Sequence, residues 1–353
     1  MLDFLATYAL FLLKAITIVA AILLVFSGIA AVAGKNRIKP REKISIRNLN
    51  HKYEDLRNAI NAETLTKYEL KELEKKKKEE EKAKKKKQKK SKKNEGNERK
   101  RIFVLNFNGD VDANAVETLR EEVTAVLTSA KPKDEVLVRV DSAGGVIHGY
   151  GLAASQLQRI RDRKIPLTVA VDKVAASGGY LMACVADKIV AAPFAIVGSI
   201  GVVAEIPNFN RLLKKHDVSY EQITAGEYKR TLSMFGENTP KGRKKMQEEV
   251  EEAHSLFKKF IAAHRPKVSI SKVSTGEHWY GTDALRLKLI DEIITSDDYL
   301  FNASDREDTS IYEITYTIRK SISEKFSFLA KAMRKGSEKA GLFKMFANMN
   351  HKL

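Results

Sequence analysis

Hydrophobic and polar positions follow two alternating patterns between residues 102 and 294. Short apolar runs at 102–107, 136–140 and 167–171 are typical of buried strands. Between these runs, apolar residues recur at the three- and four-residue spacing of helices that cover a sheet. Such residues are Val116, Leu119, Val123 and Val126 in one segment, and Leu152, Leu157 and Ile160 in the next. This alternation predicts an α/β fold with a largely parallel sheet that is covered on both faces.

The pattern changes after the third run. Residues 241–265 have the apolar stripe of a long amphipathic helix, and residues 278–294 indicate a turn followed by a short helix. The apolar stretch 183–203 could in principle cross a membrane, but it contains Asp187, Lys188 and Pro193. We interpret it as a helix end, a buried strand and a loop of the site.

The N-terminal residues have a different, continuous apolar character. Residues 4–33 contain a single charge, Lys14, and about 20 apolar residues suffice to span a bilayer as a helix. We predict a transmembrane anchor over residues 1–34. A cleaved signal peptide is the alternative, but this run is longer than the usual hydrophobic region of such peptides. The basic residues at 35–43 favour a cytoplasmic catalytic domain, although the orientation stays open.

The net charge of +18 is concentrated in one segment of low complexity. Residues 71–101 contain 17 Lys/Arg and 7 Asp/Glu, so more than half of the excess lies there. This composition predicts that residues 35–101 form a helical or disordered spacer, with contact to anionic lipid as a secondary possibility. A nucleic-acid partner is not expected, because such a surface would spread the charge over the folded domain.

Four loops contain residues that could take part in catalysis: DSAGG (141–145), AASGGY (175–180), GSIGVV (198–203) and ITAGEYKR (223–230). Parallel sheets place active sites at the carboxyl ends of their strands, where the first two loops lie. Adjacent glycines can offer backbone N–H groups to an oxyanion, and Ser177 stands at the start of a predicted helix. Taken alone, Ser177 would be a helix cap and Lys229 a surface residue.

Together, and with WYGTDA (279–284), these loops resemble those of the signal peptide peptidase A and SohB peptidases in order and spacing. The resemblance implies a Clp protease/crotonase-like spiral ββα fold, with a peptidase domain at 102–298 and a C-terminal extension at 299–353. It also implies a single-pass protein of the bacterial inner membrane. In the extension, an apolar helical face formed by Phe326, Leu329 and Met333 could lie on a membrane or on a neighbouring subunit.

The resemblance also assigns roles to residues. It implies Ser177 as nucleophile, Lys229 as general base and Ser199 as the residue that orients the lysine amine. Gly178 and one glycine of the pair 144–145 would supply the oxyanion donors. Gly145 is preferred over Gly144 within that pair. The family's usual proline in this loop is replaced by Ala143, which leaves the backbone donors in place.

A serine–lysine dyad sets conditions on its surroundings. Lysine acts as a base only when it is neutral, and burial favours the neutral form. We therefore expect Lys229 in an apolar pocket without a carboxylate partner. No metal or cofactor is expected. The resemblance further implies peptide or unfolded protein substrates and a homo-oligomer, in which Ser177 and Lys229 can come from neighbouring subunits.

Three other functions are compatible with parts of the sequence. A Ser-His-Asp hydrolase could use His148, although no G-x-S-x-G motif surrounds Ser177. A crotonase-type acyl-CoA enzyme would need the oxyanion donors but no dyad. A non-catalytic membrane scaffold would leave Ser177 as a helix cap and Lys229 in solvent.

Overall fold

The computed structural model describes residues 7–22, 42–91, 99–306 and 308–318. The chain divides into two units, of which residues 44–316 form one. The described residues of the other unit are 7–22, 42–43 and 317–318.

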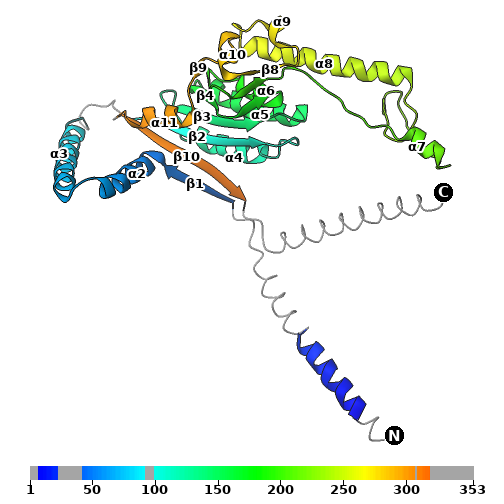
Figure 1. Ribbon diagram of the computed structural model, residues 1–353, viewed down its shortest axis with the longest axis horizontal. Helices are drawn as coiled ribbons and strands as arrows, with labels where there is room; N and C mark the ends of the chain where they lie inside the picture. The colour runs from blue at the N-terminus through cyan, green and yellow to red at the C-terminus, as the bar shows by residue number, and fades with distance from the viewer. Residues whose placement is uncertain (1–6, 23–41, 92–98, 307, 319–353) are drawn as a thin grey trace. The chain divides into compact units, whose positions relative to one another are not determined.

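One sheet organises the larger unit (Figure 1). Its strand order is β1 (Glu42–Asn48), β10 (Thr309–Ile318), β2 (Lys100–Gly109), β3 (Glu135–Ser142), β4 (Leu167–Val171), β6 (Lys188–Ala191) and β9 (Glu292–Ile293). All pairs from β10 to β9 are parallel. The predicted α/β fold with a largely parallel sheet is confirmed, and the three apolar runs lie in β2, β3 and β4.

Three short strands leave this path and form a branch of the sheet. β5 (Val174–Ala176) pairs with the end of β3 and with β7 (Ile196–Gly198). β7 pairs in turn with β8 (His278–Tyr280), and this is an antiparallel pair. The branch continues from the carboxyl end of β3, which is where the sequence predicted the site.

Alternation along the strands divides the core between the two faces of the sheet. Phe103, Leu105 and Phe107 of β2 lie in the larger cluster, with buried residues of α4 (Val116–Leu127), α5 (Ile147–Asp162) and α6 (Gly178–Ala183). Ile102 and Val104 lie in the smaller cluster with Leu49 and Leu300. Those residues belong to α2 (Leu49–Thr64) and α11 (Ser296–Ser304). Both faces of β2 are therefore buried, as its continuous apolar run requires.

The sheet extends beyond the predicted domain boundaries at both ends. The predicted spacer 35–101 contains β1 and α2, and the predicted extension 299–353 contains β10. The Asn50 amide of α2 accepts a hydrogen bond from Ile311 N (2.7 Å) and donates one to Thr309 O (3.3 Å). The highly charged part of the spacer forms a separate helix, α3 (Lys67–Ser91).

The predicted membrane anchor and C-terminal tail lie only partly within the described residues. Residues 7–22 are helical, whereas the rest of the predicted anchor 1–34 and the tail 319–353 lie outside the described residues. In the described part of the chain, no helix combines the length and the apolar character that crossing a membrane requires.

A long excursion separates β7 from the last part of the fold. Residues 201–239, which we call the arm, include α7 (Asn210–Lys215) and lead into α8 (Pro240–His264). In Figure 1, α8 extends outward from the sheet and α7 lies well away from the strands. The short helices α9 (Ile270–Val273) and α10 (Gly281–Arg286) then return the chain to β9.

Candidate active site

Ser177 lies at the turn between β5 and α6. Its backbone angles are φ 50° and ψ −118°, a combination that costs a residue with a side chain about 1–3 kcal/mol. The Ser177 N–H donates to Gly198 O (2.8 Å), which holds the turn against β7. The half-buried hydroxyl makes no capping hydrogen bond to α6. The simple explanation of Ser177 as a helix cap is therefore not supported, and its geometry resembles the strained strand–serine–helix turn of hydrolase nucleophiles.

The glycine loop after β3 packs directly on this turn. A Cβ atom at Gly144 would lie 2.7 Å from Ser177 Cβ and 2.6 Å from Gly178 N, and the φ angle of Gly144 is +91°. Both facts require glycine at this position. The structure thus brings Gly144, Ser177 and Gly178 together from loops that are more than 30 residues apart in the chain.

Two backbone donors at this junction have no acceptor within the described residues: Gly145 N–H and Gly178 N–H. Gly144 N–H, in contrast, donates to Ser142 Oγ (3.1 Å). Of the two adjacent glycines, Gly145 therefore has the free donor. Gly145 is exposed, and its Cα packs on the backbone of Val111, whose carbonyl accepts from Val146 N (2.9 Å).

A buried chain of hydroxyl groups supports the loop, and sequence reasoning did not find it. Tyr150 Oη donates to Asp110 O (2.7 Å), so the 2.5 Å bond between Tyr150 Oη and Ser142 Oγ must use the Ser142 proton. Ser142 Oγ then accepts from Gly144 N. The Tyr150 ring also packs against Gly178, where any Cβ would collide with it. Tyr150 is fully buried, and it contacts both loops that carry the candidate donors.

Ser199 follows β7, the strand that lies beside Ser177. Gly198 pairs with Ala176, and its φ of +108° lets the chain pass over the ring of Trp279. Ser199 has a φ of 51°, and its N–H donates to Glu277 O (2.7 Å). Its half-buried hydroxyl has no hydrogen-bond partner among the described residues. Ser199 therefore lies close to the group formed by Gly144, Ser177 and Gly178, and its hydroxyl is free among the described residues.

Lys229 lies outside this group. Lys229 is exposed on the arm and does not lie in the predicted apolar pocket. The arm leaves the sheet after β7, and none of its residues is buried. Its amine has no hydrogen-bond or ion-pair partner within the described ranges. The neighbouring carboxylate of Glu227 pairs with Lys241 instead, and Lys241 lies 5.8 Å from the Tyr228 ring. Within the described residues of one chain, no hydrogen bond joins the Lys229 amine to the Ser177 hydroxyl.

Other candidate groups are absent from the site. His148 is exposed in the first turn of α5 and makes no hydrogen bond to Ser177. Across the described residues, no cluster of three or more His, Cys, Asp or Glu side chains is arranged to hold a metal ion.

Known proteins match this chain over most of its length. The family models Peptidase family S49 N-terminal and Peptidase family S49 match residues 3–157 and 159–309. A probable protease SohB of Haemophilus influenzae is 48% identical over 328 residues, which cover 92% of each chain. The probable protease SohB of Buchnera aphidicola subsp. Schlechtendalia chinensis is 50% identical over 307 residues, 85% of this chain and 100% of that protein. The resemblance predicted from the loops is confirmed: this chain belongs to peptidase family S49.

Proposed function

We propose that the protein is a membrane-anchored serine endopeptidase in which Ser177 of one subunit acts with Lys229 of another. One observation carries the assignment of Ser177: its hydroxyl sits uncapped in a strained turn beside the free N–H groups of Gly145 and Gly178. Strain of this kind is kept in proteins where the conformation serves the chemistry. Membership of a peptidase family makes peptide-bond hydrolysis the reaction that this arrangement serves.

The proposed reaction begins with proton transfer from Ser177 Oγ to the neutral Lys229 amine as Oγ bonds to the substrate carbonyl carbon. The carbonyl oxygen becomes an oxyanion that accepts hydrogen bonds from Gly145 N and Gly178 N. When the C–N bond breaks, the lysine returns the proton to the leaving amine. Water, deprotonated by the same lysine, then hydrolyses the acyl-enzyme and restores Ser177.

Subunit assembly would supply what the single chain lacks. Lysine in water is protonated at neutral pH, whereas a desolvated lysine can lose its charge. The arm around Lys229 exposes apolar side chains, including Ile223 (96% exposed) and Val203 (79%), and such surfaces commonly mark protein contacts. A homo-oligomer that covers the arm would desolvate Lys229 and bring it to Ser177. The free hydroxyl of Ser199 would then accept a hydrogen bond from the lysine amine and orient it.

Location and substrates form part of the same proposal. The apolar composition of residues 4–33 supports a single-pass anchor in a bacterial inner membrane. An anchored, oligomeric peptidase would receive extended chains, such as signal-peptide remnants or misfolded envelope proteins. The branch formed by β5, β7 and β8 supports the Clp-like spiral form of the fold.

The test compares peptide hydrolysis by the full-length protein and by Ser177→Ala and Lys229→Ala variants. Each variant should lose at least about 1,000-fold in kcat, because neither member of a dyad works alone. Lys215→Ala, another exposed lysine of the arm, and His148→Ala should retain activity. Activity in Lys229→Ala would exclude the dyad, and activity in Ser177→Ala would exclude Ser177 as the nucleophile. No hydrolysis by the wild type would favour a scaffold or an acyl-CoA enzyme.

Co-expression of the two inactive variants tests the pairing between subunits. In a mixed assembly, roughly a quarter of the sites would combine an intact Ser177 with an intact Lys229 from a neighbour. Activity should therefore reappear in the mixture. If both single variants are inactive and the mixed assembly is inactive too, the dyad forms within one chain.

A further inference from the structure

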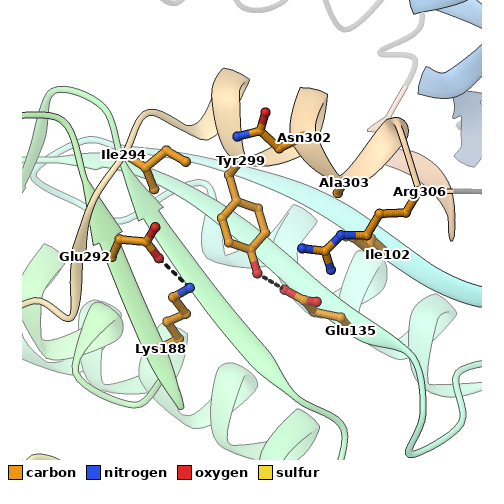
Figure 2. A pocket seen from close by; sticks show the side chains of 9 residues that line it. All are labelled: Ile102, Glu135, Lys188, Glu292, Ile294, Tyr299, Asn302, Ala303 and Arg306. Carbon is orange, nitrogen blue, oxygen red and sulfur yellow. Dashed lines mark hydrogen bonds and ion pairs between the residues drawn. The ribbon is translucent and has the colours of Figure 1, made fainter.

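A cavity of about 300 Å³ lies at the end of the sheet where β3 and β6 begin (Figure 2). Its floor includes Glu135 and Lys188, the first residues of β3 and β6, and α11 forms one wall. Ser142 and Ala176, in contrast, end β3 and β5 beside the nucleophile. The cavity is therefore separate from the proposed active site, and its volume is at the lower limit for small-ligand sites.

Both carboxylates that line the cavity are neutralised by protein cations. Glu135 accepts hydrogen bonds from Lys100 Nζ (2.7 Å), Tyr299 Oη (2.6 Å) and Thr168 Oγ1 (2.9 Å). Burial opposes ionisation of Glu135, but these hydrogen bonds, chiefly that of Lys100, hold its pKa below the ordinary value. Glu292 forms an ion pair with Lys188 (2.6 Å). Neither carboxylate needs a further cation.

The charge of Arg306, in contrast, is not neutralised by a carboxylate within the described residues. Its guanidinium makes no ion pair or side-chain hydrogen bond within the described residues, and in Figure 2 it is turned toward the phenol end of Tyr299. The adjacent Asp305 is paired with Arg57 (3.4 Å). Arg306 therefore gives the lining one uncompensated positive charge. Its planar fork of donors fits a carboxylate or a phosphate.

Apolar groups lie around this charge. Ile102, Ile294 and Ala303 line the cavity, and the ring of Tyr299 stands in its middle with Lys188 Nζ 5.3 Å from the ring centroid. An inorganic ion would leave these surfaces uncovered, whereas a ligand with an apolar body would bury them.

We propose that this cavity binds a small organic anion. The carboxylate or phosphate head of the ligand bonds to Arg306, and its apolar body packs against Tyr299 and Ile294. Binding at this site goes beyond the proposed peptidase function and does not depend on it.

The probes are benzoate, phenyl phosphate and benzamide, which differ in the head group but share one ring. Binding to the full-length protein in detergent is measured by saturation-transfer NMR with titration. A ligand of this size should bind with a Kd on the order of 1 mM. Preference for benzoate would identify a carboxylate ligand, and preference for phenyl phosphate a phosphate ligand. Benzamide is neutral and should bind at least about tenfold more weakly than the preferred anion.

Variants locate the binding. Arg306→Gln should weaken binding of the preferred anion at least about tenfold. Arg306→Lys keeps the charge but loses the planar fork of donors, so its affinity should lie between those of the wild type and Arg306→Gln. Arg243→Gln is the matched control, since Arg243 is also an exposed arginine without a partner in the described ranges but lies on α8. The proposal is overturned if neither anion binds the wild type, if benzamide binds equally well, or if Arg306→Gln binds as the wild type does.

Discussion

Gly144 and Ser177 are in such close contact that the first side-chain carbon of any other residue at position 144 would lie 2.7 Å from Ser177 Cβ. The same atom would lie 2.6 Å from Gly178 N, and the φ of +91° disfavours every residue with a side chain. The candidate nucleophile Ser177, the glycine loop and the candidate donor Gly178 are therefore in close contact with one another.

Gly144→Ala should damage activity far more than folding. The strained backbone should cost about 1–3 kcal/mol of stability, and relief of the clash would displace Ser177 or the Gly145 donor. A displacement of about 1 Å can reduce kcat about 100-fold. Peptide hydrolysis and urea denaturation on the same preparations provide the measurement.

Gly151→Ala is the matched control for this substitution. Gly151 lies within α5, and a Cβ atom there would meet no atom within 4 Å. Alanine should therefore stabilise the helix by about 0.5–1 kcal/mol and leave kcat unchanged. Equal activity in the two variants would show that the contact at Gly144 is unimportant for catalysis.

Tyr150→Phe should lower kcat without changing KM substantially. The substitution removes the hydroxyl that joins Ser142 to Asp110 O, and Ser142 in turn holds Gly144 N. A less fixed loop would weaken the hydrogen bond to the oxyanion, which exists only after attack, so we expect about a tenfold loss in kcat.

Tyr180→Phe separates this effect from simple destabilisation. Tyr180 is as fully buried as Tyr150, and its hydroxyl donates to Leu289 O (3.0 Å), outside the Ser142–Tyr150–Asp110 chain. Both variants should lose about 1 kcal/mol of stability. A similar loss of kcat in both would contradict a positioning role for the Tyr150 hydroxyl.

Glu122 should make folding stability fall as the pH rises. Burial in α4 raises the pKa of its carboxyl to about 7, while Oε1 accepts from Tyr316 N (2.9 Å) and Oε2 is buried without a partner. The folded state thus binds the proton more tightly than the unfolded state. The stabilisation is present below about pH 4.5 and is lost as the pH passes through 7.

Glu122→Gln resembles the protonated carboxyl at every pH. It should match the wild type near pH 4 and exceed it at pH 8 by about 3 kcal/mol, since each pKa unit is worth about 1.4 kcal/mol. Urea denaturation at both pH values measures the difference. A difference between Glu122→Gln and the wild type that stays constant with pH would refute the prediction.

The parts of the fold that the sequence predicted are those with a strong local signal. β4 is apolar at every position except Thr168, and all five of its residues are buried, so its bounds follow from composition alone. β10 alternates between polar and apolar residues, and β1 lies beside a charged segment, so both were assigned to flanking regions. β5, β7 and β8 have three residues each, which is too short for any periodicity.

The site divides in the same way. The glycine loop and the loop of Ser177 were predicted as parts of the site because each follows a strand of a parallel sheet. The role of Ser177 as nucleophile came from the family resemblance. The Ser142–Tyr150–Asp110 chain joins three separate segments, so only the folded structure could reveal it. Lys229 was predicted by resemblance, and its exposure on the arm differs from the apolar pocket that we expected from the chemistry of a dyad.

Asn50→Ala tests whether the first part of the predicted spacer belongs to the folded domain. The Asn50 side chain replaces a strand partner for β10, because it bonds to both Ile311 N and Thr309 O. Its loss should cost about 1–2 kcal/mol and should speed hydrogen exchange of the Ile311 amide. Lys52 is exposed and lies two positions after Asn50 in α2, so Lys52→Ala should change stability by less than about 0.5 kcal/mol. Unchanged exchange at Ile311 in Asn50→Ala would show that the Asn50 side chain does not stabilise this part of β10.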